Sequence, residues 1–252
     1  MKKTKTADLL PLAVLLLAAA GCVLRSELYL KAMDGKGLLL QNHPLELLLW
    51  CCTGAAALVA LPAARQGYRV KSYAANFDAS LPAALGHILA GSGILLTVLL
   101  SPAPSRELIG TLWKVTGLVS CPALYGAAFS RIRGSRPFFG LYGMLSVFFA
   151  MHLVANYQLW CADPQLQNYV YAFLASLMLM LFAYYQAAFC VDGGSSFRLR
   201  LTGLLAVYFC LTALAKSTMP YLYGGCAVWA FTGLSRLRPR REKKAGDGHG
   251  AS

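Results

Sequence analysis

Residues 81–100 read Leu81-Pro-Ala-Ala-Leu-Gly-His-Ile-Leu-Ala-Gly-Ser-Gly-Ile-Leu-Leu-Thr-Val-Leu-Leu100, a run that contains no Asp, Glu, Lys or Arg. The hydrocarbon core of a bilayer is about 30 Å thick and an α-helix rises about 1.5 Å per residue, so a span needs roughly 17 to 25 apolar residues. The run is too long and continuous for a barrel strand, and backbone groups in lipid must be satisfied within the chain. It therefore predicts a transmembrane helix.

Seven other segments are apolar over a comparable length. In chain order, with the quoted run in third place, the predicted spans are Leu9–Leu24, Gly37–Pro62, Leu81–Leu100, Leu108–Phe129, Pro137–Trp160, Gln167–Val191, Leu199–Ala215 and Pro220–Leu234. We therefore expect an all-α fold, a polytopic membrane helical bundle of about eight transmembrane helices. The transmembrane domain covers residues 1–235, and a basic tail follows over residues 236–252.

The composition supports a membrane solvent. Hydrophobic residues make up 58% of the 252 residues and charged residues only 13%, whereas soluble domains carry about 25% charged residues. The net charge of +13 raises the question of nucleic-acid binding. The basic residues, however, lie between the apolar runs and form no basic face interleaved with aromatic residues. We expect no nucleic-acid partner and interpret the charge as a determinant of membrane topology.

The basic residues also predict an orientation. Most fall on one side of the predicted spans, in clusters at Lys2–Lys5, Arg65–Lys71, Arg131–Arg136, Arg198–Arg200 and Arg236–Lys244. Loops rich in Lys and Arg remain in the cytoplasm. We therefore expect a multi-pass protein of the plasma membrane with cytoplasmic N- and C-termini. The basic tail is expected to contact anionic lipids of the bilayer.

The prolines suggest an internal repeat. Pro44, Pro104 and Pro164 are 60 residues apart, Pro220 follows 56 residues later, and each lies where an outward-going helix turns back. Proline is favoured at the first position of a helix because its φ is already set and its missing N–H would have no partner there. This spacing predicts four tandem hairpins with a period of about 60 residues.

The first span has two interpretations. The stretch Lys2-Lys, a Leu-rich core and Ala18-Ala-Ala-Gly-Cys22 is similar to a bacterial lipoprotein signal peptide, in which Cys22 would be lipidated after cleavage. We expect a plain first helix, because Ala19 stands where Leu is usual. The alternative, cleavage before Cys22, would leave seven helices.

Several polar residues fall inside or at the outer edge of the spans, where they are costly and suggest function. His152 and Asn156 are four residues apart and share a helix face. The predicted polar pocket in the outer half consists of Lys114, His152, Asn156, Glu46, Glu107 and His43. The competing interpretations are that Lys114 extends toward the headgroups and that His152 and Asn156 only join helices by hydrogen bonds.

Motifs for chemistry are missing from the sequence. It contains no Walker A loop, no HExxH and no dinucleotide-binding glycine fingerprint, and its eight cysteines form no CxxC or Cys/His cluster. Ser92, within Gly91-Ser-Gly93, has no identifiable base. We therefore assign no catalytic residue, metal ligand or cofactor, and expect the cysteines to pack between helices without a structural disulfide.

The stretch Tyr157-Gln-Leu-Trp-Cys-Ala-Asp-Pro-Gln-Leu-Gln167, with Tyr184-Tyr-Gln-Ala-Ala-Phe189, resembles uncharacterised multi-pass membrane proteins of anaerobic Gram-positive bacteria. The resemblance covers mainly the fifth to seventh predicted helices. It implies a bacterial plasma membrane and carries over no catalytic residues or activity.

Three classes of function fit these observations. The first is a small permease or permease subunit whose outer polar pocket takes a small-molecule ligand. The second is a non-catalytic membrane sensor or assembly component, which would bind another membrane protein. The third is an intramembrane enzyme, which would need Lys114, His152 and either Glu46 or Glu107 to converge.

Overall fold

The computed structural model describes residues 3–32, 43–65, 71–103, 108–161 and 169–235. Within these ranges the chain is helical and contains no strand, in agreement with the expected all-α fold. The elements are α1 (Lys3–Lys31), α2 (Pro44–Arg65), α3 (Tyr73–Asn76), α4 (Leu81–Leu100), α5 (Leu108–Arg133), α6 (Phe139–Trp160), α7 (Val170–Cys190), α8 (Ser196–Leu214) and α9 (Pro220–Ser235).

Seven of the helices, α1, α2 and α4 to α8, are long and apolar enough to cross a membrane. The remaining long helix, α9, has 16 residues, slightly fewer than the roughly 17 that a span requires. Large apolar side chains also remain on the outside of the bundle: Leu58, Leu99 and Leu108 are 71%, 66% and 72% exposed. Such a surface suits contact with lipid, and the protein has the character of an integral membrane protein.

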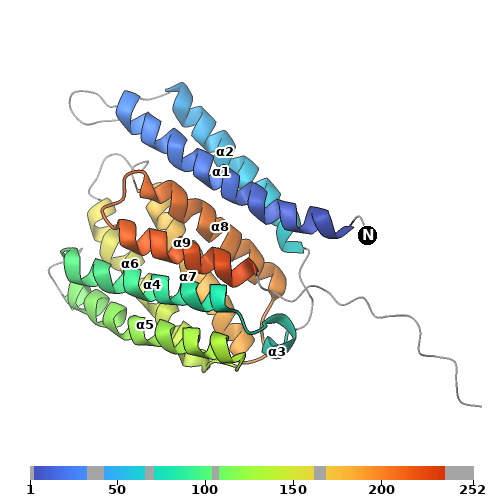
Figure 1. Cartoon of the computed structure of the whole chain (residues 1–252). Helices are drawn as coiled ribbons and strands as arrows, with labels where there is room; N and C mark the ends of the chain where they lie inside the picture. Colours follow the sequence, from blue (N-terminus) through green and yellow to red (C-terminus); the bar gives the residue numbers. More distant parts are fainter. Residues whose placement is uncertain (1–2, 33–42, 66–70, 104–107, 162–168, 236–252) are drawn as a thin grey trace, which may run out of the picture.

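Six helices pack around a common interior. In order around the bundle, α4 packs against α5, α5 against α6, α6 against α7, α7 against α8 and α8 against α9, and α9 packs in turn against α4. We call this arrangement the six-helix ring. The α1–α2 pair lies outside it, along α8, as the upper pair of helices in Figure 1 shows.

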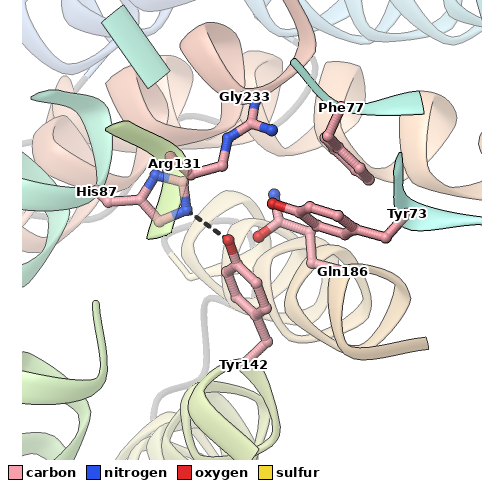
Figure 2. Close-up of a pocket in the computed structure, with 7 residues that line it drawn as sticks. All are labelled: Tyr73, Phe77, His87, Arg131, Tyr142, Gln186 and Gly233. Carbon is pink, nitrogen blue, oxygen red and sulfur yellow. Dashed lines mark hydrogen bonds between the residues drawn. The ribbon is translucent and has the colours of Figure 1, made fainter. Parts of the chain in front are cut away.

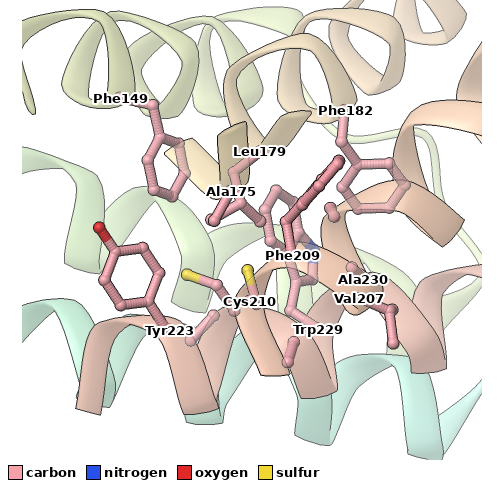
Figure 3. Packing of buried hydrophobic residues seen from close by; sticks show 14 of the residues in the cluster. Phe149, Ala175, Leu179, Phe182, Val207, Phe209, Cys210, Tyr223, Trp229 and Ala230 are labelled. Carbon is pink, nitrogen blue, oxygen red and sulfur yellow. The ribbon is translucent and has the colours of Figure 1, made fainter. Parts of the chain in front are cut away.

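The interior of the ring is filled by side chains. Phe149, Leu179, Phe182 and Trp229 are fully buried and come from α6, α7 and α9, as shown in Figure 3. The rings of Phe182 and Trp229 meet edge to face, with centroids 4.8 Å apart. Aromatic rings in this geometry pack favourably beyond the area that they bury. The middle of the bundle is therefore an apolar layer, and polar groups gather nearer its two ends.

Close approach of α4 and α9 depends on glycines. A Cβ atom on Gly225 of α9 would lie 2.6 Å from the carbonyl oxygen of Leu89 in α4. Gly86 and Gly93 of α4 face α9 with equally little space. Small residues let two membrane helices bring their backbones together, which explains how the last helix closes the ring.

The helix bounds correct several sequence predictions. The first helix does not end at Leu24 but continues to Lys31, and Cys22 lies within it. The second begins at Pro44 rather than Gly37, and the fourth long helix extends past Phe129 to Arg133. The short helix α3 was not predicted. Like Pro44, Pro220 begins its helix, whereas Pro104, Pro164 and the basic tail lie outside the described residues.

Candidate functional site

The ring has two distinguishable ends. At one end α4, α6 and α8 begin, and the cluster of Arg131, Arg133 and Arg136 lies there, so we call it the basic end. At the other, α5, α7 and α9 begin, and we call it the far end. The far end corresponds to the outer side in the sequence prediction.

A cavity of about 160 Å³ lies at the far end, between α1 and the ring. We call it the far-end pocket. It is lined by Arg25, Asn156, Tyr169, Ala172, Ala213, Lys216, Ser217, Thr218, Met219 and Tyr223. The lining combines two cationic side chains and several hydroxyl or amide groups with an apolar wall, and no carboxylate occurs among these ten residues.

Arg25 is the buried cation of the far-end pocket. Its side chain extends from α1, and the residue is only 2% exposed. The guanidinium donates from Nη1 to the carbonyl oxygen of Thr212 at 3.1 Å and lies 5.0 Å from the ring centroid of Tyr171. These contacts on α7 and α8 fix the direction of the side chain. The planar fork of a guanidinium suits recognition of a carboxylate.

Lys216 brings a second positive charge to the same pocket. It follows α8, is exposed, and its ammonium lies 4.2 Å from the ring centroid of Tyr29. Arg25 also donates to the Tyr29 hydroxyl, at 3.4 Å. The two cations thus share one aromatic neighbour, and the exposed position of Lys216 puts its charge where an approaching solute would meet it.

His152 and Asn156 are brought together, and only Asn156 lines the far-end pocket. The Asn156 amide donates to the backbone carbonyl of His152 at 2.8 Å. The indole N–H of Trp113 donates to Nδ1 of His152 at 3.0 Å, so the neutral ring carries its proton on Nε2. That nitrogen faces the hydroxyl of Tyr223, 3.4 Å away. His152 therefore supports a wall of the pocket from behind.

The other predicted pocket residues have different neighbours. Glu46 lines a smaller cavity on the other side of Arg25, beside Trp50 and Tyr171. Nδ1 of His43 accepts from the backbone N–H of Leu45 at 3.3 Å, which is a local contact at the start of α2. Lys114 is exposed on α5 and lines neither cavity, and Glu107 lies outside the described residues.

A second polar cluster lies at the basic end, in a small cavity of about 10 Å³. We call it the basic-end cluster. It is lined by Tyr73, Phe77, His87, Arg131, Tyr142, Gln186 and Gly233, which come from α3, α4, α5, α6, α7 and α9 and the residue after α3. Figure 2 shows these side chains converging on one space. Apart from Gly233, each of these residues is at most 6% exposed.

Arg131 is incompletely satisfied in this cluster. Both terminal nitrogens of its guanidinium are buried and have no hydrogen-bond acceptor among the described residues. The guanidinium lies 4.9 Å from the ring centroid of Phe77. A desolvated cation–π contact contributes about 2 kcal/mol, whereas burying an ion still costs several kcal/mol and each unsatisfied donor a further 1–3 kcal/mol or so. The ring face alone does not compensate this charge.

The tautomer of His87 determines the direction of its hydrogen bond with Tyr142. Its Nδ1 donates to the carbonyl of Ala83 at 2.6 Å, so in the neutral ring Nε2 is an acceptor. The Tyr142 hydroxyl, 2.9 Å away, therefore donates to Nε2.

The amide oxygen of Gln186 is buried with no donor among the described residues. Burial raises the pKa of Tyr73, and the nearby Arg131 opposes that rise, so its hydroxyl keeps its proton.

The segment around α3 covers the basic end. Tyr73 stacks on Phe77 with centroids 4.7 Å apart, and Phe77 meets Phe189 of α7 edge to face at 5.3 Å. The backbone N–H of Tyr73 donates to Oδ1 of Asp192 at 3.1 Å. Asp192 also forms an ion pair with Arg136 at 2.9 Å. These contacts hold α3 over the basic-end cluster.

Two observations in the described ranges concern metal binding and nucleophilic catalysis. No group of three or more His, Cys, Asp and Glu side chains there is arranged to hold a metal ion. The hydroxyl of Ser92 lies 3.2 Å from that of Tyr125, and no histidine or carboxylate is among its hydrogen-bond partners in the described residues.

Sequence reasoning missed Arg25, Lys216, Tyr223, Arg131 and Gln186 as site residues. The three cations were interpreted only as topology signals. For Arg25 and Arg131 the usable signal was helix length: with α1 continued to Lys31 and α5 to Arg133, both arginines fall inside helices. A charge inside a membrane helix is a functional candidate.

Comparisons of the chain with protein-family models, with curated proteins and with solved structures found no match.

Proposed function

We propose that the protein is a small permease, or the substrate-binding subunit of one, that takes a small organic anion in the far-end pocket. The observation that carries the proposal is a buried arginine, Arg25, lining a cavity of about 160 Å³ near the end of a membrane bundle. Charged groups within membrane proteins commonly mark substrate pathways.

The size and lining of the pocket suggest the substrate class. A cavity of about 150 Å³ holds a molecule the size of benzene, so the pocket suits a solute of about six non-hydrogen atoms. A carboxylate would meet Arg25 and the amide of Asn156, and a short carbon chain would contact Ala172 and Ala213. Lys216 would attract the anion electrostatically. Monocarboxylates of two to four carbons fit this description.

The proposed setting is the plasma membrane of a bacterium, as the resemblance of residues 157–167 implies. In this setting the eight long helices cross the membrane as four hairpins, with both termini in the cytoplasm and the basic tail on anionic lipids. The pairs α1–α2, α4–α5, α6–α7 and α8–α9 pack together, as hairpins require, and α5–α6 and α7–α8 pack together as well. The far-end pocket then opens in the outer half.

A non-catalytic sensor or assembly component is the second candidate, and the filled interior of the ring favours it. Phe149, Leu179 and Phe182 are fully buried between the two ends, so a ligand in the pocket has no open path through this conformation. The intramembrane enzyme has the least support, because Lys114 lines neither cavity.

The proposal is tested with purified protein and proteoliposomes. We expect acetate, propionate or lactate to raise the thermal midpoint of the protein, and the uncharged amides of the same acids to leave it unchanged. Arg25→Gln should abolish the shift, whereas Lys114→Gln, which removes a charge from the outside of α5, should retain it.

Transport is measured separately. Uptake of the radiolabelled acid that binds best, driven by its gradient into proteoliposomes, would identify a permease. Binding without uptake would identify the sensor or subunit. If no carboxylate shifts the midpoint of the unmodified protein, the anion-binding pocket is rejected.

A further inference from the structure

We propose that the basic-end cluster is a binding site for a single monatomic anion of the chloride class, held by Arg131. This site differs from the far-end pocket and does not depend on the function proposed for that pocket. None of the residues that line one cavity lines the other. Ala172 and Gln186 mark the two sites on α7, fourteen residues or about 21 Å apart along the helix.

The first step is the unsatisfied guanidinium. Arg131 is 3% exposed, and both of its terminal nitrogens are buried without an acceptor. In Figure 2 the side chain extends into the space bounded by Tyr73, Phe77 and Gln186. A buried cation that has no hydrogen-bonding counter-charge is strongly unfavourable. An occupant that accepts hydrogen bonds and carries negative charge removes both costs.

The second step is the supply of other donors around the cavity. Tyr73 and Gln186 line the same cavity as Arg131, and each carries a polar group that can donate a hydrogen bond. The oxygen and nitrogen of a glutamine amide are assigned from the hydrogen bonds around them, and here the oxygen has none. Turning the amide directs its N–H groups to the cavity, so that an anion receives bonds from Arg131, Tyr73 and Gln186. The Tyr142 hydroxyl is already engaged with His87.

The third step is size. The cavity has room for the centre of about one water-sized particle, with a volume of about 10 Å³. A carboxylate, phosphate or sulfate does not fit in this space, whereas chloride and bromide are only slightly larger than water. A water molecule fits as well, but it leaves the positive charge of Arg131 uncompensated. None of the seven lining residues is acidic, and charge therefore favours the halide.

The α3 segment separates the basic-end cluster from solvent. The α3 segment covers the cluster, with Tyr73 held to Asp192 and Phe77 packed on Phe189. The anion is thus enclosed between the ring and α3. Release requires α3 to move, so we expect slow exchange with solvent and a contribution of the bound halide to stability.

The test begins with the unmodified protein in detergent, exchanged into gluconate buffer at constant ionic strength. Titration with chloride or bromide should raise the thermal midpoint, while sulfate and phosphate should not reproduce the shift. Equilibrium dialysis with radiolabelled chloride should give about one ion per chain in the Arg25→Gln variant, which removes the buried cation of the far-end pocket. In a crystal grown with bromide, the anomalous peak should lie beside Arg131.

Arg131→Gln should abolish bound chloride and the halide-dependent shift. Arg133→Gln is the matched control, because Arg133 is exposed on the same last turn of α5 and should keep both. Should Arg131→Gln not fold, Gln186→Leu takes its place, and we expect at least a threefold weaker chloride affinity.

Two outcomes would overturn the proposal. One is a midpoint that does not respond to the identity of the anion at constant ionic strength, with no chloride retained in dialysis, which would identify a bound water only. The other is chloride binding that survives Arg131→Gln and is lost in Arg25→Gln. That result would assign the halide to the far-end pocket and leave the function proposed for that pocket standing.

Discussion

Two buried tryptophans differ in whether their indole N–H has a partner. Trp113 and Trp229 are both fully buried, but Nε1 of Trp113 donates to His152, whereas Nε1 of Trp229 has no acceptor among the described residues. Replacement by Phe removes a hydrogen bond at Trp113 and an unsatisfied donor at Trp229.

We therefore expect Trp113→Phe to lower the free energy of unfolding by about 1–3 kcal/mol more than Trp229→Phe does. Both variants lose similar ring volume, so the cost of the cavity largely cancels in the comparison. Unfolding followed by circular dichroism in mixed micelles measures the difference. Equal losses in the two variants would contradict the assigned role of the Trp113–His152 bond.

At the residue scale the sequence shows which polar residues lie within the helices more reliably than whether their side chains face the interior of the bundle or its outside. The sequence left open whether Lys114 lines a pocket or extends toward the headgroups. Lys114 is exposed, while its neighbour Trp113 points inward and supports His152. The side chains of adjacent helical residues are rotated by about 100° around the helix axis. A prediction that shifts the buried face by one residue therefore exchanges the buried and the exposed side chain. In a chain apolar on every side, hydrophobicity does not mark that face.

At the scale of the elements, the α4–α9 contact offers a matched pair of glycines. A Cβ on Gly225 would meet the Leu89 carbonyl at 2.6 Å, whereas a Cβ on the adjacent Gly224 would have nothing within 4 Å. We expect Gly225→Ala to destabilise the protein by roughly 1–3 kcal/mol through overpacking. Gly224→Ala should be neutral or stabilising by up to about 1 kcal/mol, because alanine is the better helix former.

Thermal unfolding of the two glycine variants in detergent distinguishes these expectations. If both variants have the midpoint of the unmodified protein, α4 and α9 do not approach as closely as described.

The α3 segment gives a second prediction at this scale. Asp192 accepts from the backbone N–H of Tyr73 and has a positive φ of 55°, a conformation that both Asn and Gly tolerate. Asp192→Asn keeps an oxygen acceptor, and Asp192→Gly removes it. We expect amide exchange of α3 to be about two- to tenfold faster in Asp192→Gly than in Asp192→Asn.

Hydrogen exchange measured by mass spectrometry reports on α3 directly, and peptides from α8 serve as an internal control. Unchanged exchange of α3 in Asp192→Gly would show that aromatic packing on Phe189 holds the segment without the carboxylate.

Long helices were predictable and short ones were not. Apolar runs identified the eight long helices that the described ranges contain, because length alone separates them from strands. Their ends were less certain, since Arg25 and Arg131 lie within helices whose sequence pattern suggested an earlier end. The four residues of α3 have no periodicity to detect, and only their contacts with α7 explain their place.

For the whole molecule, the distribution of Lys and Arg predicts that the basic end faces the cytoplasm. We expect a green fluorescent protein fused after residue 252 to fluoresce and alkaline phosphatase fused there to be inactive. Phosphatase fused after Ser217, beyond α8 at the far end, should be active. The opposite pattern would reverse the orientation and place the far-end pocket on the inner side.

The ring itself was beyond sequence reasoning. Neighbouring hairpins follow from short connections, but nothing in the sequence near α4 identifies α9 as its partner. The helix that approaches the glycines of α4 is found only from packing. The same holds for the basic-end cluster, whose members lie on six different elements.

The pairing of α4 with α9 has a consequence for biosynthesis. The ribosome makes α4 before the other helices of the ring and α9 after them, so α4 stays without this neighbour until the rest of the ring has been made. The α1–α2 pair waits similarly, because α8, against which it packs, is made after α4, α5, α6 and α7. Helices inserted early thus remain open to chaperones, to degradation or to wrong pairing until their later partners have been made, and a chain that stops before α9 leaves the glycine face of α4 uncovered.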